Sequence, residues 1–320
     1  MTNIAVFDYG LLTPLHLSEL RERLQDCALT VFNGDMEILP DADIILGNPD
    51  PKELHRCRRL KLLQTFSAGS DGYVSFMPKG AQLTNATGSY GLAISEHMLA
   101  MLLTLMKKLH LYGKNQQECL WRDEGAVTRI DGARALVVGL GDIGGEFAKR
   151  LHALGAHTAG IRRVGKEKPE YLDELYDPTS LDLLLPEADI VALCLPNTPQ
   201  TIGLMNRERI GLMKKGAYLL NVGRGGAVDM EALRDALNRE LLGGAGLDVT
   251  EPEPLPADHP LWKAKNLILT PHVSGGAHLP ETVNRILSIA AYNVCAVLSG
   301  EPLRNEVDFS TGYRKLTQNS

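Results

Sequence analysis

The sequence has 320 residues, of which 44% are hydrophobic and 22% are charged, and its formal net charge is −6. This length suits two domains better than one, and the ordinary composition indicates a chain that buries substantial cores. The mildly acidic balance favours no nucleic-acid or membrane surface, no apolar run approaches the ~18 residues of a membrane span, and the N-terminus lacks the basic and long apolar regions of a signal peptide.

The cysteines are odd in number, scattered, and without a C-x-x-C pair. They are Cys27, Cys57, Cys119, Cys194 and Cys295. Such spacing predicts reduced thiols in a cytoplasmic protein rather than a disulfide framework. We expect no metal site.

Short apolar runs alternate with a helical pattern in the first hundred residues. The expected strands are 4–7, 44–46, 62–66 and 82–84. Leu17, Leu20 and Leu24 form one face of a helix between the first strands. This alternation predicts a parallel sheet with helices on both faces.

A broad apolar stripe, rich in methionine, predicts one long helix over 91–112. A stripe of this kind is typical of a core or a subunit interface. The segment 113–131 contains Trp121 and has weak periodicity, so it is predicted to be a connection or a dimer arm.

The stretch 135–163 has the pattern of a strand, a turn, a helix and a second strand. Its glycines follow the first strand in G-x-G-x-x-G spacing, which permits a tight turn, a close approach to a pyrophosphate and close helix packing. The N–H groups at the helix N-terminus then face the phosphates. The expected dinucleotide contacts are Gly139, Gly141, Asp142, Ile143 and Gly144, with a solvent-facing side chain as the alternative for Asp142.

A rival motif lies just downstream. Residues 160–166 nearly match a phosphate-binding P-loop, but the next residue is Glu167 rather than the Ser or Thr that would hold Mg²⁺. We therefore reject this alternative.

The alternation continues to the end of the chain. The strands expected from the glycine motif onward are 136–138, 158–161, 189–195, 217–222, 245–249 and 267–270. Six strands are the number of a full dinucleotide-binding domain. Helices are expected near 181–185, 207–213, 229–239 and 280–298, with Asp229 as an N-terminal cap.

Reactive side chains follow the last three of these strands. Arg224 lies in NVGRGG, Glu253 in TEPEPLP and His272 in TPHVSGG. Ligands of such sheets bind beyond the carboxyl ends of the strands, so we expect the three to converge. Arginine suits a carboxylate and its neighbouring carbonyl, and an imidazole kept charged by a carboxylate suits proton transfer during hydride transfer. Ordinary loop roles are the alternative, and Glu251 is a competing acid.

The order and spacing of these motifs resemble the D-isomer-specific 2-hydroxyacid dehydrogenases, over nearly the whole chain. The motifs are SAGSDG (67–72), the glycine motif, LPNTPQT (195–201), NVGRGG (221–226), GLDVTEPEPLP (246–256) and TPHVSGG (270–276). The resemblance implies that Arg224 binds the substrate, and that Glu253 assists the acid/base His272. It further implies a small 2-keto acid or 2-hydroxy acid as substrate, and a homodimer.

The resemblance assigns further contacts to backbone and side-chain groups. Ala68 and Gly69 would offer N–H groups to the substrate carboxylate, and Asp248 would bind the nicotinamide amide. Thr198 and Gly275 would line the cofactor.

We expect two doubly wound parallel-sheet α/β domains. A Rossmann cofactor domain over 98–289 would be inserted into a flavodoxin-like substrate domain formed by 1–97 and 290–320.

The end of the second strand of the glycine unit bears on cofactor choice. NAD-preferring members of the family usually carry an acid there, whereas Arg162 and Arg163 stand here and no acid follows until Glu167. Arginine can pair with a 2′-phosphate, so the sequence predicts NADP(H), with Lys166 adding positive field. NAD(H) remains the alternative if both arginines face solvent.

Two rival functions remain. An NAD(P)H-sensing protein of this fold, like a corepressor, would bind the dinucleotide with little turnover. Formate dehydrogenases carry glutamine where Glu253 stands.

Of the other histidines, His97 is predicted to be structural and His278 is a second candidate. Tyr73, Phe76 and Tyr90 either shape an apolar substrate pocket or pack.

Overall fold

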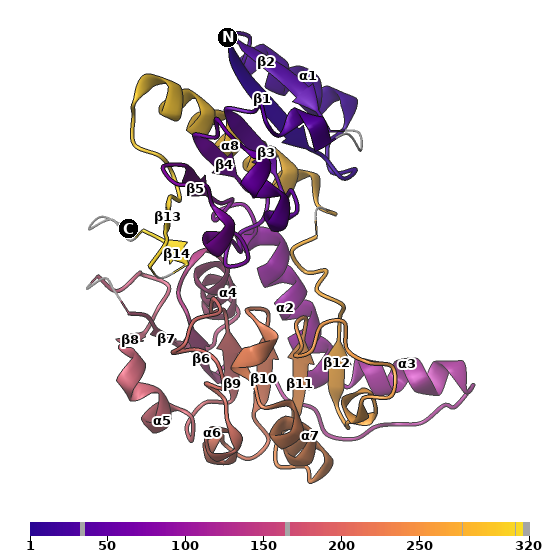
Figure 1. The fold of residues 1–320 in the computed structure, drawn as a ribbon. Helices are drawn as coiled ribbons and strands as arrows, with labels where there is room; N and C mark the ends of the chain where they lie inside the picture. Colours follow the sequence, from indigo (N-terminus) through magenta and orange to yellow (C-terminus); the bar gives the residue numbers. More distant parts are fainter. Residues whose placement is uncertain (33–35, 164–166, 277, 311, 316–320) are drawn as a thin grey trace. The chain divides into compact units, whose positions relative to one another are not determined.

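The computed structural model describes residues 1–32, 36–163, 167–276, 278–310 and 312–315. They form two compact units, Met1–Tyr90 with Ala277–Ser320, and Gly91–Gly276 (Figure 1). Each unit contains its own parallel sheet.

The first unit is built on a five-stranded parallel sheet with the order β2-β1-β3-β4-β5. Its strands are β1 (Thr2–Phe7), β2 (Cys27–Val31), β3 (Ile44–Gly47), β4 (Leu62–Gln64) and β5 (Gln82–Thr84). This order is the flavodoxin arrangement. Strand β2 was not predicted, although its sequence CALTV is largely apolar; it is an edge strand whose residues are half-buried or exposed.

Two helices and several short elements complete this unit. They are α1 (Pro14–Arg23), η1 (Met36–Ile38), η2 (Pro51–Arg56), η3 (Val74–Phe76), α8 (Pro280–Ser299), β13 (Val307–Asp308) and β14 (Tyr313–Arg314). Helix α1 begins with a capping box, in which Thr13 Oγ1 accepts the His16 N–H and His16 Nδ1 accepts the Thr13 N–H.

A buried side-chain network joins α8 to the sheet of the chain's first part. Asn293 Nδ2 and Thr84 Oγ1 both donate to Gln64 Oε1, at 2.6 and 2.7 Å. Asn293 Oδ1 also accepts the Arg304 N–H at 2.8 Å. These bonds hold together two stretches of chain that are separated by the whole second unit.

Helix α8 is also long and apolar enough, by length and composition, to cross a membrane. Its mean hydropathy over an 18-residue window is 1.2, although no uninterrupted apolar run of that length exists. Half of this window is buried inside the protein, which is the pattern of a core helix as well.

The second unit is built on a seven-stranded parallel sheet with the order β12-β11-β10-β9-β6-β7-β8. Its strands are β6 (Arg134–Val138), β7 (His157–Ile161), β8 (Glu174–Tyr176), β9 (Ile190–Leu193), β10 (Tyr218–Asn221), β11 (Gly244–Leu247) and β12 (Leu267–Leu269). This is the Rossmann order with β12 added beyond the sixth strand. The sequence predicted six strands and missed β8, an edge strand of three half-buried residues.

Six helices belong to this unit among the residues that the structure describes. They are α2 (Gly91–Met106), α3 (Leu109–Gln117), α4 (Asp142–Ala153), α5 (Leu181–Leu184), α6 (Arg207–Leu212) and α7 (Met230–Asn238), accompanied by the short turns η4 (Pro178–Ser180), η5 (Gly225–Ala227) and η6 (Pro260–Lys263). Asp229 caps α7 as predicted, accepting the Ala232 N–H at 2.9 Å.

The prediction of one continuous helix over 91–112 is wrong. Helix α2 ends at Met106, and Lys108 adopts a left-handed conformation with φ 58° before α3 begins. The chain that follows α3 returns to this break, where the Thr128 N–H binds the Met106 carbonyl at 3.2 Å and Lys107 Nζ binds the Thr128 carbonyl at 2.7 Å. The first of these bonds satisfies the last carbonyl of α2 in place of a further helical turn, and the second holds the returning chain there.

The predicted fold class is confirmed, because a unit of Rossmann order is inserted into a unit of flavodoxin order. The predicted divisions at 97/98 and 289/290 fall inside α2 and α8, whereas the compact units divide just before each helix, after Tyr90 and after Gly276.

The network around Asn293 generates a stability prediction. Asn293→Leu removes buried hydrogen bonds that cost about 1–3 kcal/mol when lost. We expect amide exchange in the α8 and β4 peptides to accelerate roughly 5- to 150-fold, measured by hydrogen–deuterium exchange and mass spectrometry. Asn284→Leu, at an exposed position of the same helix, is the control. Equal exchange in the two variants would contradict the role of the network.

Candidate active site

The glycine turn between β6 and α4 leaves no room for side chains. Gly139 has φ 99°, and a Cβ there would lie 2.5 Å from the Cys194 carbonyl oxygen. A Cβ on Gly144 would lie 1.9 Å from the Gly139 oxygen. Gly141 stands at the N-cap and has no side chain with which to cap the first N–H groups of α4. Such an N-terminus is suited to bind a pyrophosphate.

Asp142 and Ile143 open α4, and Asp142 does not simply face solvent. Its Oδ2 accepts the Gly91 N–H at 2.8 Å, and a Cβ on Gly91 would lie 2.5 Å from Asp142 Oδ1. The carboxylate therefore ties the first turn of α2 to the first turn of α4.

The end of β7 presents the two arginines that the sequence singled out. Arg162 follows the last strand residue, and its guanidinium donates to the Glu167 carbonyl while its Nε is buried without a partner among the described residues. Arg163 is exposed. Lys166, and with it the end of the P-loop-like stretch, lies outside the described residues.

Tyr171 lies over the first turn of α4, beside this strand end. Its hydroxyl would be 2.9 Å from a Cβ built on Gly145. Burial raises the pKa of Tyr171, and the positive charge of Arg162 opposes that rise. The arginine and the phenol therefore lie near each other, and the phenol covers the first turn of α4.

The loops that follow β9, β10 and β11 touch one another. A Cβ on Gly223 would lie 2.5 Å from the Leu195 oxygen, and one on Gly225 would lie 1.9 Å from the Thr250 oxygen. The loops that follow these neighbouring strands thus pack closely against one another at one edge of the sheet.

Arg224 is held on the turn after β10. The buried Asn221 shapes that turn, because its Oδ1 accepts the Gly223 N–H and its Nδ2 donates to the Arg224 carbonyl, both at 3.0 Å. Arg224 Nη1 donates to the Gly223 carbonyl at 2.9 Å. Sequence analysis gave Asn221 no role, although it opens the NVGRGG motif.

His272 and Glu253 form a pair. His272 Nδ1 and Glu253 Oε2 are 3.0 Å apart, and Glu253 Oε1 accepts the Thr250 N–H at 3.4 Å. The competing acid Glu251 lies beside the turn of Arg224, where a Cβ on Gly226 would be 4.0 Å from its Oε2. A carboxylate bound at Nδ1 fixes the orientation of the ring and leaves Nε2 for another partner.

Asp248 holds the turn that carries His272. Its buried carboxylate accepts Thr270 Oγ1 at 2.6 Å, the Val273 and Ser274 N–H groups at 3.0 Å each, and the Ser274 hydroxyl. These bonds use the four acceptor positions of a carboxylate. The contact to a nicotinamide amide that the resemblance implies stays a prediction.

The remaining residues predicted to line the cofactor lie in turns at the same edge. Thr198 is buried in the turn after β9, where its N–H binds Thr201 Oγ1 at 2.9 Å. Gly275 lies in a turn closed by the Gly276 N–H on the Val273 carbonyl at 2.8 Å.

Ala68 and Gly69 belong to the first unit, in the loop after β4. Ser67 Oγ stiffens this loop by donating to the Gly69 carbonyl at 2.7 Å and accepting from Asn48 Nδ2 at 2.9 Å.

The three aromatic residues near this loop differ. Tyr73 and Tyr90 are buried, and their hydroxyls bind the carbonyls of Pro49 and Phe66, so they pack. Phe76 is 42% exposed and is the one that could meet a ligand. His278, the second candidate histidine, is exposed in the same unit.

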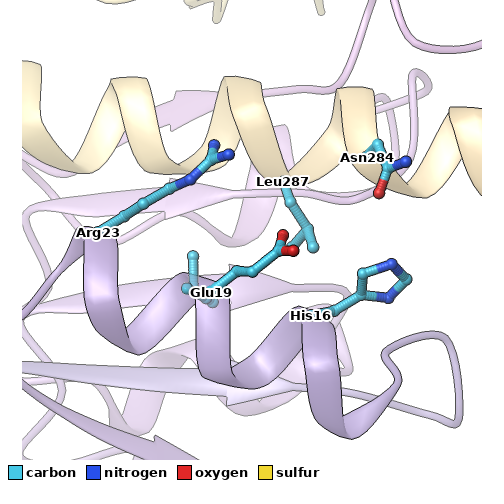
Figure 2. A pocket seen from close by; sticks show the side chains of 6 residues that line it. His16, Glu19, Arg23, Asn284 and Leu287 are labelled. Carbon is cyan, nitrogen blue, oxygen red and sulfur yellow. The ribbon is translucent and has the colours of Figure 1, made fainter.

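A separate pocket of about 190 Å³ lies in the first unit between α1 and α8 (Figure 2). It is lined by His16, Glu19, Leu20, Arg23, Asn284 and Leu287, none of which the sequence proposed as a site residue. Within the described parts of the chain, no group of three or more His, Cys, Asp or Glu side chains could hold a metal ion.

Comparisons with known proteins bear on the whole arrangement. The family model described as "D-isomer specific 2-hydroxyacid dehydrogenase, NAD binding domain" matches residues 99–274. The chain is 33% identical over 299 residues to a glyoxylate reductase of Thermofilum pendens, covering 87% of this chain and 88% of that protein.

Two solved structures are similar throughout. A D-isomer specific 2-hydroxyacid dehydrogenase of Xanthobacter autotrophicus, in complex with NADPH and MES, has a TM-score of 0.82 at 28% identity, covering 98% of this chain and 100% of that one. A D-lactate dehydrogenase of Aquifex aeolicus, with NAD and lactic acid, has a TM-score of 0.74 at 27% identity, covering 93% and 96%. The protein therefore belongs to the D-isomer-specific 2-hydroxyacid dehydrogenases, enzymes that use a nicotinamide dinucleotide.

Proposed function

We propose that the protein reduces a small 2-keto acid to the D-2-hydroxy acid and prefers NADPH as its cofactor. The observation that carries the proposal is the His272–Glu253 pair, which stands at the same sheet edge as the turn of Arg224. The similarity to a glyoxylate reductase supports a small keto acid, and the NADPH in the Xanthobacter structure supports the cofactor.

The glycine turn fits a dinucleotide. Gly139 and Gly144 pack directly against backbone atoms, and the N-terminus of α4, with Gly141 at its N-cap, offers N–H groups that no side chain of the cap residue binds. Gly141, Asp142 and Ile143 would bind the pyrophosphate with them, while Thr198 and Gly275 would line the cofactor. The cofactor, when bound, supplies the hydride.

The chain's own residues supply binding and a proton. Arg224 would hold the substrate carboxylate and polarise the carbonyl with its planar fork. For the first unit, we retain the N–H groups of Ala68 and Gly69 as proposed carboxylate contacts. His272 would donate the proton from Nε2 to the carbonyl oxygen, because Nδ1 is bound to Glu253. Glu253 orients the ring and stabilises the imidazolium.

A turnover panel tests the proposed function. Glyoxylate, hydroxypyruvate, pyruvate and phenylpyruvate are offered with NADPH and with NADH. Turnover of at least one acid supports a reductase. Tight binding of NADPH with no turnover of any acid would favour the sensor alternative.

The acid/base role of His272 is tested by substitution. We expect His272→Ala to lower kcat by roughly 10²–10⁴-fold, the usual range for a positioned acid/base, while NADPH binding measured by fluorescence survives. Glu253→Gln should also lower kcat. Glu251→Gln is the matched control, because the acid that binds His272 Nδ1 is Glu253. A His272→Ala enzyme within twofold of wild type would exclude the role.

Cofactor preference is argued from the end of β7. The buried Nε of Arg162 has no partner among the described residues, and the exposed guanidinium of Arg163 stands next to it. Charge-assisted bonds from arginine to a 2′-phosphate favour NADPH over a bare ribose hydroxyl. A difference of about 1.4–3 kcal/mol corresponds to roughly 10- to 150-fold.

We therefore expect kcat/KM to be 10- to 150-fold higher with NADPH than with NADH. Arg162→Asp combined with Arg163→Ala should abolish that preference by removing the two cations. Arg207→Ala, on the distant helix α6, is the control. Equal use of both cofactors by the wild type, or an unchanged preference in the double variant, would refute the assignment.

We further propose that the protein is a cytoplasmic homodimer joined through the arm that follows α3, residues 118–131. The arm is built on α3, because Asn115 Nδ2 and Arg122 Nε both bind Glu124 Oε1, at 2.6 and 2.8 Å. It nevertheless leaves Trp121 fully exposed. A large aromatic side chain held on an ordered arm is typical of a subunit interface. The free cysteines support a reducing compartment.

Light scattering should give a mass near twice 34.9 kDa at micromolar concentration. Trp121→Ser should weaken the dimer, whereas Trp262→Ser, at a half-exposed position on η6, should leave it intact. A wild-type mass of one chain would rule the dimer out.

A further inference from the structure

We propose that His97, on α2, is a positioning residue for the acid/base His272, and that it acts through Thr270 and Asp248. The inference rests on the proposed function of His272. Sequence analysis predicted a structural role for His97, and nothing in the motifs linked it to the TPH turn.

The hydrogen bonds form a directed chain. His97 Nε2 lies 3.1 Å from Thr270 Oγ1, and Thr270 Oγ1 lies 2.6 Å from Asp248 Oδ1. An ionised carboxylate has no proton to give, so the single hydroxyl proton of Thr270 points to Asp248. The hydroxyl oxygen must then accept from His97, which places a proton on Nε2.

Asp248 connects Thr270 to the turn formed by residues 272–274. Its remaining bonds hold the Val273 and Ser274 N–H groups, and its backbone carbonyl accepts the His272 N–H at 2.8 Å. His272 itself has φ 53°, a conformation that a residue other than glycine keeps only when its surroundings hold it. His97 therefore fixes the rotamer of Thr270, and Thr270 helps to hold the Asp248 carboxylate that positions the turn of His272.

Side chains of α2 other than His97 hold this helix against β11. A Cβ on Gly246 of β11 would lie 3.1 Å from Met101 Sδ, and one on Gly244 would lie 3.0 Å from a Leu105 methyl carbon. These close contacts pack the helix on the strand. Loss of the His97 donor should therefore loosen the 270–274 turn while α2 keeps its place.

Three variants test the chain of bonds. His97→Leu removes the donor, His97→Gln supplies an amide donor in its place, and Thr270→Val removes the hydroxyl. We expect His97→Leu to lower kcat roughly 3- to 30-fold, the range of coupling through such networks, with the KM for the keto acid and the Kd for NADPH within twofold of wild type. His97→Gln should restore most of the loss.

The double variant separates a shared path from two independent effects. If His97 acts through Thr270, His97→Leu should add no further loss of kcat to Thr270→Val. Additive losses would overturn the proposal. The matched control is His110→Leu, because His110 Nε2 contacts Asn266 Oδ1 at 3.3 Å just before β12, at the strand's opposite end. It should keep wild-type kcat.

Amide exchange gives a readout that is independent of catalysis. Peptides spanning 270–276 should exchange faster in His97→Leu than in wild type or His97→Gln, while those of α2 and β11 stay unchanged. Unchanged exchange in 270–276, or equal losses of kcat in the Leu and Gln variants, would overturn the positioning role. Failure of the proposed function would appear separately, as full activity of His272→Ala.

Discussion

The buried carboxylate of Asp248 is the constraint on which the carboxyl edge of the inserted sheet depends. A buried charge is costly unless it is fully hydrogen-bonded, and here all its acceptor positions are taken by the turn after β12. Only this conformation of the turn supplies the hydrogen bonds that compensate for burying the charge of Asp248. His272 can remain at a positive φ because leaving it would break this set of bonds.

Glycines set how closely the parts of this edge approach. Gly144 brings α4 against the Gly139 carbonyl, and Gly225 brings the turn of Arg224 against the Thr250 carbonyl. In both places a methyl group would overlap backbone atoms, so neither contact can be relieved by moving a side chain. Backbone that packs directly on backbone therefore carries Arg224, the His272–Glu253 pair and the turn proposed to bind phosphate. Such packing restricts the movement of these groups relative to one another.

The features of this edge that depend on the order and spacing of motifs could be predicted from the sequence. The strand that ends before Arg224, the pair of Glu253 with His272, and the glycine turn all follow from spacing, because parallel strands deliver their carboxyl ends to one edge. Features decided by tertiary contacts escaped it. Edge strands β2 and β8 are only half-buried or exposed, and the break at Lys108 depends on bonds from the returning arm around Thr128. The bonds of Asp248 to the 270–274 turn were not predicted, because two of its four partners are backbone N–H groups, which leave no trace in the sequence.

Helix α2 explains where the inserted unit begins. Its first N–H is bound by Asp142 of the glycine turn, its middle is hydrogen-bonded through His97 to Thr270, and Met101 packs on Gly246 of β11. The helix therefore belongs to the inserted unit from Gly91 onward, although its apolar stripe alone is equally consistent with a boundary at residue 97. One rigid element thus contacts both the turn proposed to bind phosphate and the turn that carries the proposed proton donor. These two turns follow opposite halves of the sheet, and the hydrogen bonds of Gly91 and His97 connect α2 to both of them.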